Sequence, residues 1–182
     1  NKNSKAYEVL TNLSSTKNNI ILDFNYTAST RLILKQCGLS DEDIDNRLIK
    51  VHGEASNNDI IFGVEDNAGI KKEHVFLRKA YNIKYKALNF SELYDRIKSV
   101  AIFGHSLGET DHTYFNKLFQ ESCMYNKFST NNNKEFWLFY YKENGYHCMM
   151  QQLDSLTHNS LTSFRQYNRV NFINTDKEKV FI

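Results

Sequence analysis

The sequence predicts an α/β protein with a mainly parallel sheet and flanking helices. Short apolar runs alternate along the chain with segments of helical period, the order typical of strand–helix–strand units. Hydrophobic residues make up 41% of the 182 residues and aromatic residues 14%, which suffices for a buried core and excludes intrinsic disorder. Proline is absent and glycine occurs seven times, so no linker divides the chain. We therefore expect one domain over residues 1–182.

The N-terminal half contains five patterned segments. The segment Ser4–Leu13 is typical of the end of a helix, and the compact apolar run Asn19–Phe24 predicts a buried strand. Thr27–Gly38 predicts a helix that ends where Gly38 can adopt a left-handed conformation. Two further short strands are expected at Leu48–His52 and Ile60–Val64.

Side-chain positions follow from the helical period. In the helix at 27–38 the cap is expected at Thr27 or Ser29. Its inward stripe is predicted to be Ala28, Leu32, Ile33 and Cys37. The C-terminal half is predicted to contain a helix at Ser91–Ser99, a strand at Val100–Gly104, a helix at Glu109–Met124 with Tyr114, Phe115, Leu118, Phe119 and Ser122 inward, a strand at Glu135–Lys142, one or two helices within Tyr146–Tyr167, and a last strand at Val170–Ile173.

Charge and cysteine content exclude several classes of protein. With 23 basic and 21 acidic residues the formal charge is +2, which does not indicate a nucleic-acid or membrane-surface binder. No apolar run approaches the ~20 residues needed to span a bilayer. Cys37, Cys123 and Cys148 are odd in number and far apart, so we expect reduced thiols in the cytoplasm. No metal is expected, since no His or Cys ligands have a metal-site spacing.

Ligands of parallel sheets bind beyond the carboxyl ends of the strands, and unusual residues follow three of the predicted strands. Asn25 comes directly after the first strand; its amide either contacts a ligand or water, or satisfies backbone groups of the turn. His52 ends a later strand and suits either acid/base chemistry or a structural role. Gly53 permits a sharp turn or the close approach of a ligand.

The most informative stretch runs from Gly104 to Asp111. A buried strand leads into a loop with two glycines and the hydroxyl of Ser106, and acidic residues follow at a helix start. Backbone N–H groups at such a junction can bind phosphate or ribose oxygens. Asp111 can cap the helix, shape a pocket, or do both. The glycine spacing is not that of a dinucleotide fingerprint.

Four motifs in order carry a resemblance to a known family: Phe24-Asn25-Tyr26-Thr27, His52-Gly53, Ile60-Ile61-Phe62-Gly63, and the stretch from Phe103 to Asp111. Their combination resembles the AbiH family of bacterial phage abortive-infection proteins. More distantly, it is similar to the sirtuin-like domains of antiphage systems. The sequence pattern of the sirtuin-like domains is threonine-asparagine-tyrosine-aspartate, then histidine-glycine, then glycine-tyrosine-serine-leucine-x-aspartate.

The resemblance implies a Rossmann-like fold and a role in phage defence, with NAD as the candidate substrate. It implies that Asn25 holds the attacking water and that His52 contacts the ribose hydroxyls or acts as the base. Gly104 and Ser106 would line the nucleotide pocket, and the neighbouring motif residues Tyr26, Gly53, His105 and Asp111 would also bind the nucleotide.

Two features depart from the sirtuin-like pattern. Nothing before Asn19 resembles the Gly-rich strand–loop–helix that binds the pyrophosphate, so we expect this chain to be the C-terminal part of a longer protein, inactive without the preceding part. Thr27 stands where the pattern has aspartate, which suits the AbiH branch.

Three hypotheses for function stay open. The first is an enzyme that hydrolyses NAD during infection. The second is a module that binds a nucleotide or a phage component without turnover and acts through oligomerisation or protein contacts. The third is an interaction protein without a small-molecule site. Partners are thus a nucleotide and a second copy of the chain, with an unidentified phage component as trigger.

Overall fold

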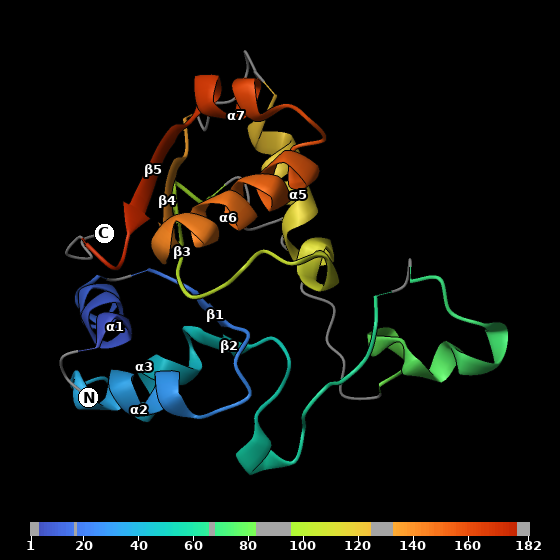
Figure 1. Ribbon diagram of the computed structural model, residues 1–182. Helices are drawn as coiled ribbons and strands as arrows, with labels where there is room; N and C mark the ends of the chain where they lie inside the picture. The colour runs from blue at the N-terminus through green and yellow to red at the C-terminus, as the bar shows by residue number, and fades with distance from the viewer. Residues whose placement is uncertain (1–3, 17, 66–67, 83–95, 125–132, 178–182) are drawn as a thin grey trace. The chain divides into compact units, whose positions relative to one another are not determined.

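The computed structural model describes residues 4–16, 18–65, 68–82, 96–124 and 133–177 of the chain. They form two compact units, the first within residues 4–82 and the second within residues 96–177. Both units are mixed α/β, and each contains a small sheet in which all strands are parallel (Figure 1). Within these ranges no helix has the length and apolar character needed to cross a membrane.

The first unit is built on two short parallel strands. It contains α1 (Lys5–Ser15), β1 (Ile21–Asp23), α2 (Ser29–Gln36), α3 (Asp41–Asp45) and β2 (Leu48–Lys50), followed by the 3₁₀ helices η1 (Ala55–Asn57), η2 (Lys72–Leu77) and η3 (Lys79–Tyr81). Leu10, Leu34, Ile44 and Leu48 bring three helices and β2 into one apolar cluster. Each such buried side chain contributes about 2 kcal/mol of hydrophobic stabilisation.

The inward stripe predicted for α2 is wrong at Leu32, which is 58% exposed, whereas Leu34 is fully buried. Leu32, Ile33 and Leu34 are consecutive, so they spread over most of the helix circumference and only part of them can face the core. The predicted cap also differs. Ala28 is the N-cap residue without a side-chain hydrogen bond, while the hydroxyls of Thr27 and Ser29 lie 3.0 Å from each other.

The strand predicted at Ile60–Val64 does not form. The Ile61 N–H donates to the His52 carbonyl over 3.0 Å, and Val64 makes only an isolated bridge to Arg78. The backbone groups of this segment are thus engaged by a local turn and by η2, which leaves no ladder with β1 or β2. Gly38, by contrast, has the left-handed φ of +91° that was predicted for it.

The second unit is a β-α-β-α-β arrangement. It contains β3 (Ser99–Ile102), η4 (Glu109–Asp111), α5 (His112–Ser122), β4 (Glu135–Tyr140), α6 (Lys142–Leu156), α7 (Leu161–Tyr167) and β5 (Arg169–Asn174). β4 is the central strand, paired in parallel with β3 and β5. These elements confirm the predicted strands at 100–104, 135–142 and 170–173. They also show that the segment 146–167 belongs to two helices, the first of which begins at Lys142. The helix predicted at Ser91–Ser99 lies mostly outside the described residues.

The core of this unit lies between the sheet and its helices. Phe136 of β4 packs against Phe119 of α5 and Phe164 of α7, with ring centroids 5.6 Å and 4.8 Å away. Tyr146 of α6 contacts Tyr140 on the same sheet face, so α5, α6 and α7 share one side of the strands (Figure 1). The inward residues predicted for α5 are confirmed, since all five are buried. On the other face Phe139 is buried and Trp137 is half-buried.

Candidate functional site

A partly buried ion pair lies at the carboxyl ends of β1 and β2. Asp23 and Lys50 are register partners in the parallel pair, and Lys50 Nζ donates to Asp23 Oδ2 over 2.9 Å. The Asp23 side chain is almost fully buried. The same ammonium group also donates to the backbone carbonyls of Asn25 and Thr27. The loop between β1 and α2 is therefore folded around Lys50, which no sequence prediction assigned to the site.

The second carboxylate oxygen of Asp23 orients Asn25. It accepts from the Asn25 backbone N–H over 2.9 Å and from Asn25 Nδ2 over 3.1 Å. Because a carboxylate only accepts hydrogen bonds, the amide nitrogen must be the atom that faces it. The exposed Asn25 side chain therefore keeps its carbonyl oxygen as an acceptor for water or a ligand.

His52 is held between two aromatic rings. It is 5% exposed, the Phe24 ring meets it edge-on at 5.5 Å, and the Tyr26 ring stacks on it at 5.9 Å. The backbone here is fixed as well, since Val51 N–H donates to the Asp23 carbonyl and Ile61 N–H donates to the His52 carbonyl, each over 3.0 Å.

Gly53 makes the turn that follows His52. Its φ is +74°, and a Cβ built on it would lie 2.1 Å from the backbone oxygen of Asp59. Asp59 in turn accepts the Glu54 N–H on its side chain over 2.6 Å. The close approach that Gly53 permits is therefore an approach of this chain's own backbone.

The loop after β3 in the second unit is braced by His105. Its Nδ1 accepts the Leu107 N–H over 2.9 Å, so the neutral ring carries its proton on Nε2, which lies 3.3 Å from Asp111 Oδ2. Leu107 is fully buried, whereas Gly104 and Ser106 are exposed. His105 and Asp111 thus hold the loop, and Gly104 and Ser106 form its accessible part.

His112 ties the same loop to α6. Its Nε2 lies 3.0 Å from the Leu107 carbonyl oxygen and 2.9 Å from Gln152 Oε1. Both neighbours can accept a hydrogen bond, so the ring donates from Nε2. Sequence reasoning missed this contact because Gln152 lies on another helix, 40 residues away.

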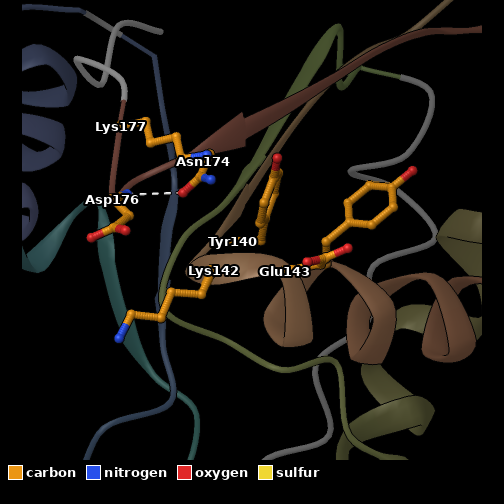
Figure 2. Close-up of a pocket in the computed structure, with 7 residues that line it drawn as sticks. Tyr140, Lys142, Glu143, Asn174, Asp176 and Lys177 are labelled. Atoms are coloured by element: carbon orange, nitrogen blue, oxygen red, sulfur yellow. Dashed lines mark hydrogen bonds between the residues drawn. The ribbon is translucent and has the colours of Figure 1, made fainter.

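A hollow of about 380 Å³ lies at the carboxyl ends of β4 and β5. Figure 2 shows Tyr140 and Asn174 from the strand ends, with Lys142 and Glu143 from the start of α6. The Asp176 N–H donates to Asn174 Oδ1 over 3.0 Å. The residues that line the hollow are Tyr140, Lys142, Glu143, Tyr146, Asn174, Asp176 and Lys177. No motif marked them; only the general rule for strand ends could have indicated the place.

The predicted site residues fall into two groups, each described within its own unit. Asn25, Tyr26, His52 and Gly53 lie together beyond β1 and β2, and Gly104, His105, Ser106 and Asp111 lie together beyond β3. Asp23 and Lys50 complete the first group; a charge at the end of two successive apolar strands is the signal that could have found them. Across the described parts of the chain, no group of three or more His, Cys, Asp or Glu residues is placed to hold a metal.

The parallel sheets with flanking helices make this an α/β protein. Polar loops follow the strands, so its candidate ligand sites lie at the carboxyl edges of the sheets. The sequence model of the family described as bacteriophage abortive infection AbiH matches residues 1–141. The match covers more than half of the chain and includes all eight predicted site residues. The chain belongs to the AbiH family of abortive-infection phage-defence proteins. Neither the curated proteins nor the solved structures include a match to it.

Proposed function

We propose that this abortive-infection protein stops phage multiplication by hydrolysing NAD, with the reaction at Asn25 and His52. The observation that carries the proposal is the orientation of Asn25: its amide nitrogen is held by Asp23, so its oxygen is presented at the strand edge. The distant likeness to sirtuin-like antiphage domains supports NAD as the substrate. The β-α-β-α-β order of the second unit supports a Rossmann-like arrangement.

The proposed chemistry is the hydrolysis of one glycosidic bond. The water oxygen forms a bond to C1′ of the ribose, and the bond from C1′ to the nicotinamide nitrogen breaks with its electron pair on that nitrogen. The positively charged pyridinium thereby leaves as neutral nicotinamide. Asn25 Oδ1 accepts one hydrogen of the water and positions it, and the His52 imidazole takes the proton that is released.

Each unit by itself offers further predicted contacts to a nucleotide. The exposed Ser106 hydroxyl and the Gly104 backbone suit ribose hydroxyls, while His105 and Asp111 keep this loop in shape. The Leu107 N–H is already taken by His105, which argues against a phosphate at that amide. Tyr26 and Gly53 would border the reacting end of the substrate.

One observation favours the second candidate function, a binding module without turnover. His52 is 5% exposed and packed between Phe24 and Tyr26, as expected for a structural histidine. In that case the protein binds a nucleotide or a phage component, and host shutdown follows from oligomerisation or protein contacts.

The test is to measure cellular NAD and plaque formation in infected bacteria that express the full-length protein. NAD should fall and plaques should decrease for the unaltered protein, while Asn25→Ala and His52→Gln should lower the hydrolysis rate about 100-fold or more. Asn46→Ala, an exposed asparagine at the end of α3, is the matched control and should behave as the unaltered protein. Thermal unfolding of the purified variants separates loss of fold from loss of chemistry.

Each outcome distinguishes the hypotheses. Protection without NAD loss contradicts hydrolysis and favours the binding module. NAD loss that His52→Gln leaves unchanged contradicts the assignment of the base. Loss of NAD at an undiminished rate in Asn25→Ala contradicts the site itself.

A further inference from the structure

Tyr26, which follows Asn25 in the chain, and Phe62 are exposed aromatic side chains whose rings lie next to each other. Phe62 is 70% exposed and Tyr26 36%, and their ring centroids are 5.4 Å apart. Tyr26 stacks in turn on His52 with an interplanar angle of 29°. A row of rings therefore leads from the buried imidazole to the surface. Phe62 and Tyr26 are called the aromatic pair below.

The backbone holds the aromatic pair in place. Ala55 N–H donates to the Tyr26 carbonyl over 2.8 Å. Phe62 follows Ile61, whose N–H is bonded to His52, and precedes Gly63, where a Cβ would lie 2.4 Å from the Leu77 carbonyl oxygen. Phe62 is thus exposed on a fixed segment. Exposed apolar side chains that are held rigidly are typical of surfaces that bind something.

We propose that the aromatic pair binds the flat heterocycle of a nucleotide, stacked on Phe62 and Tyr26 with its polar edge toward Asn25. Aromatic rings stack on any heterocycle face, and a pyridinium ring gains an additional cation–π attraction. Asn25 precedes Tyr26 in the loop after β1, and its exposed side-chain oxygen is the hydrogen-bond acceptor proposed for the edge of the ring. The identity of the ligand as a nucleotide rests on the proposed function, but stacking does not require hydrolysis.

The chain offers a matched control in Phe76 of η2. It is 63% exposed, close to the value for Phe62, and belongs to the same unit. Its aromatic contact is different, because His74 meets it edge-on at 6.3 Å and 85°. Phe76 therefore matches Phe62 in exposure but does not belong to the row of rings that leads to His52.

The experiment uses Phe62→Trp as a fluorescent reporter in the full-length protein, with Phe76→Trp as control. Trp137 is the one native tryptophan of this sequence and gives both variants the same background. Nicotinamide mononucleotide and AMP are titrated as the two ring-bearing halves of NAD, and ribose 5-phosphate as a probe without a ring. At saturation we expect nicotinamide mononucleotide or AMP to quench the Phe62→Trp emission by about half, with no effect of ribose 5-phosphate. The probe that quenches identifies the ring as nicotinamide or adenine.

The proposal is overturned if neither ring-bearing probe quenches, or if Phe76→Trp responds as strongly as Phe62→Trp. A second measurement uses calorimetry: Phe62→Ala should weaken binding of the quenching probe about tenfold, and Phe62→Tyr should restore it. Quenching without NAD consumption contradicts the proposed hydrolysis and leaves the stacking site intact. NAD consumption with an unchanged KM in Phe62→Ala contradicts the stacking site and leaves hydrolysis intact.

Discussion

At the scale of single residues, Gly53 and Gly104 are two positions that require glycine for different physical reasons. Both have left-handed backbone angles, with φ of +74° and +64°. A Cβ at Gly53 would overlap the Asp59 carbonyl, whereas a Cβ at Gly104 would meet nothing within 4 Å. Gly104 is therefore required only by its backbone angle, and Gly53 also by the space around it.

This difference predicts unequal costs for the same substitution. Gly104→Ala should destabilise the protein by about 1 kcal/mol, the strain of a left-handed alanine. Gly53→Ala should cost about 3 kcal/mol or more, because the turn at Asp59 must move as well. Urea unfolding of the two purified variants measures both values. Equal free energies of unfolding would contradict the close approach seen at Gly53.

At the scale of elements, α2 shows how neighbours select the buried side of a helix. Leu34 faces Leu10 of α1 and Ile44 of α3, and Leu32 faces solvent. Ion pairs on the surface add to this arrangement, since Lys35 donates to Asp41 at the start of α3 over 2.7 Å. The hydrogen bond from Lys35 and the nearby Arg31 hold the pKa of Asp41 below its usual range. Asp41 is exposed, so solvent screens the pair and the apolar contacts dominate.

Two leucines on one helix therefore test the packing directly. Leu34→Ala should destabilise the protein by about 3 kcal/mol, since it leaves a cavity among Leu10, Ile44 and Leu48. Leu32→Ala should change the free energy of unfolding by less than about 0.5 kcal/mol. Thermal and urea unfolding provide the comparison. If Leu32→Ala proves the more costly substitution, the stripe predicted from the sequence is right and the observed packing is wrong.

At the scale of the whole molecule, the second unit contains a core made of its own residues. Phe119, Phe136 and Phe164 come from α5, β4 and α7, and Leu138, Leu153 and Leu156 are fully buried in the same range of the chain. About 90 residues with such a core are within the range of independently folding domains.

We therefore expect residues 88–179, expressed alone, to unfold cooperatively. The far-ultraviolet circular dichroism should show helix and a single thermal transition, because Phe119, Phe136 and Phe164 of this unit form an aromatic core with one another. Phe119→Ala in the same fragment should lower or remove the transition. A fragment without a cooperative transition would instead support the prediction of one domain over residues 1–182.

Local patterns of the sequence were sufficient for most elements. The period of α5 identified its five buried residues, and the apolar runs identified the strands at β1, β2, β3, β4 and β5. The apolar pattern did not predict the buried side of α2 correctly, because three consecutive apolar residues are compatible with more than one inward face. It failed also at Ile60–Val64, where backbone bonds to His52 and to η2 replaced strand pairing.

The sequence by itself determined the α/β class, the five observed strands and most of the longer helices, the family, and the places where strands end in polar loops. These properties depend on residues a few positions apart in the chain, and the spacing of apolar and polar residues indicates them directly. Only the tertiary structure decided that Lys50 meets Asp23, that Asp23 orients Asn25, and that His52 lies between Phe24 and Tyr26. Lys50 and Asp23, and likewise His52 and its two aromatic neighbours, are brought together only by the parallel pairing of β1 and β2, so no repeating pattern in the chain indicates these contacts. The contact between Asp23 and Asn25 is local, but its direction depends on side-chain orientation, which periodicity does not specify.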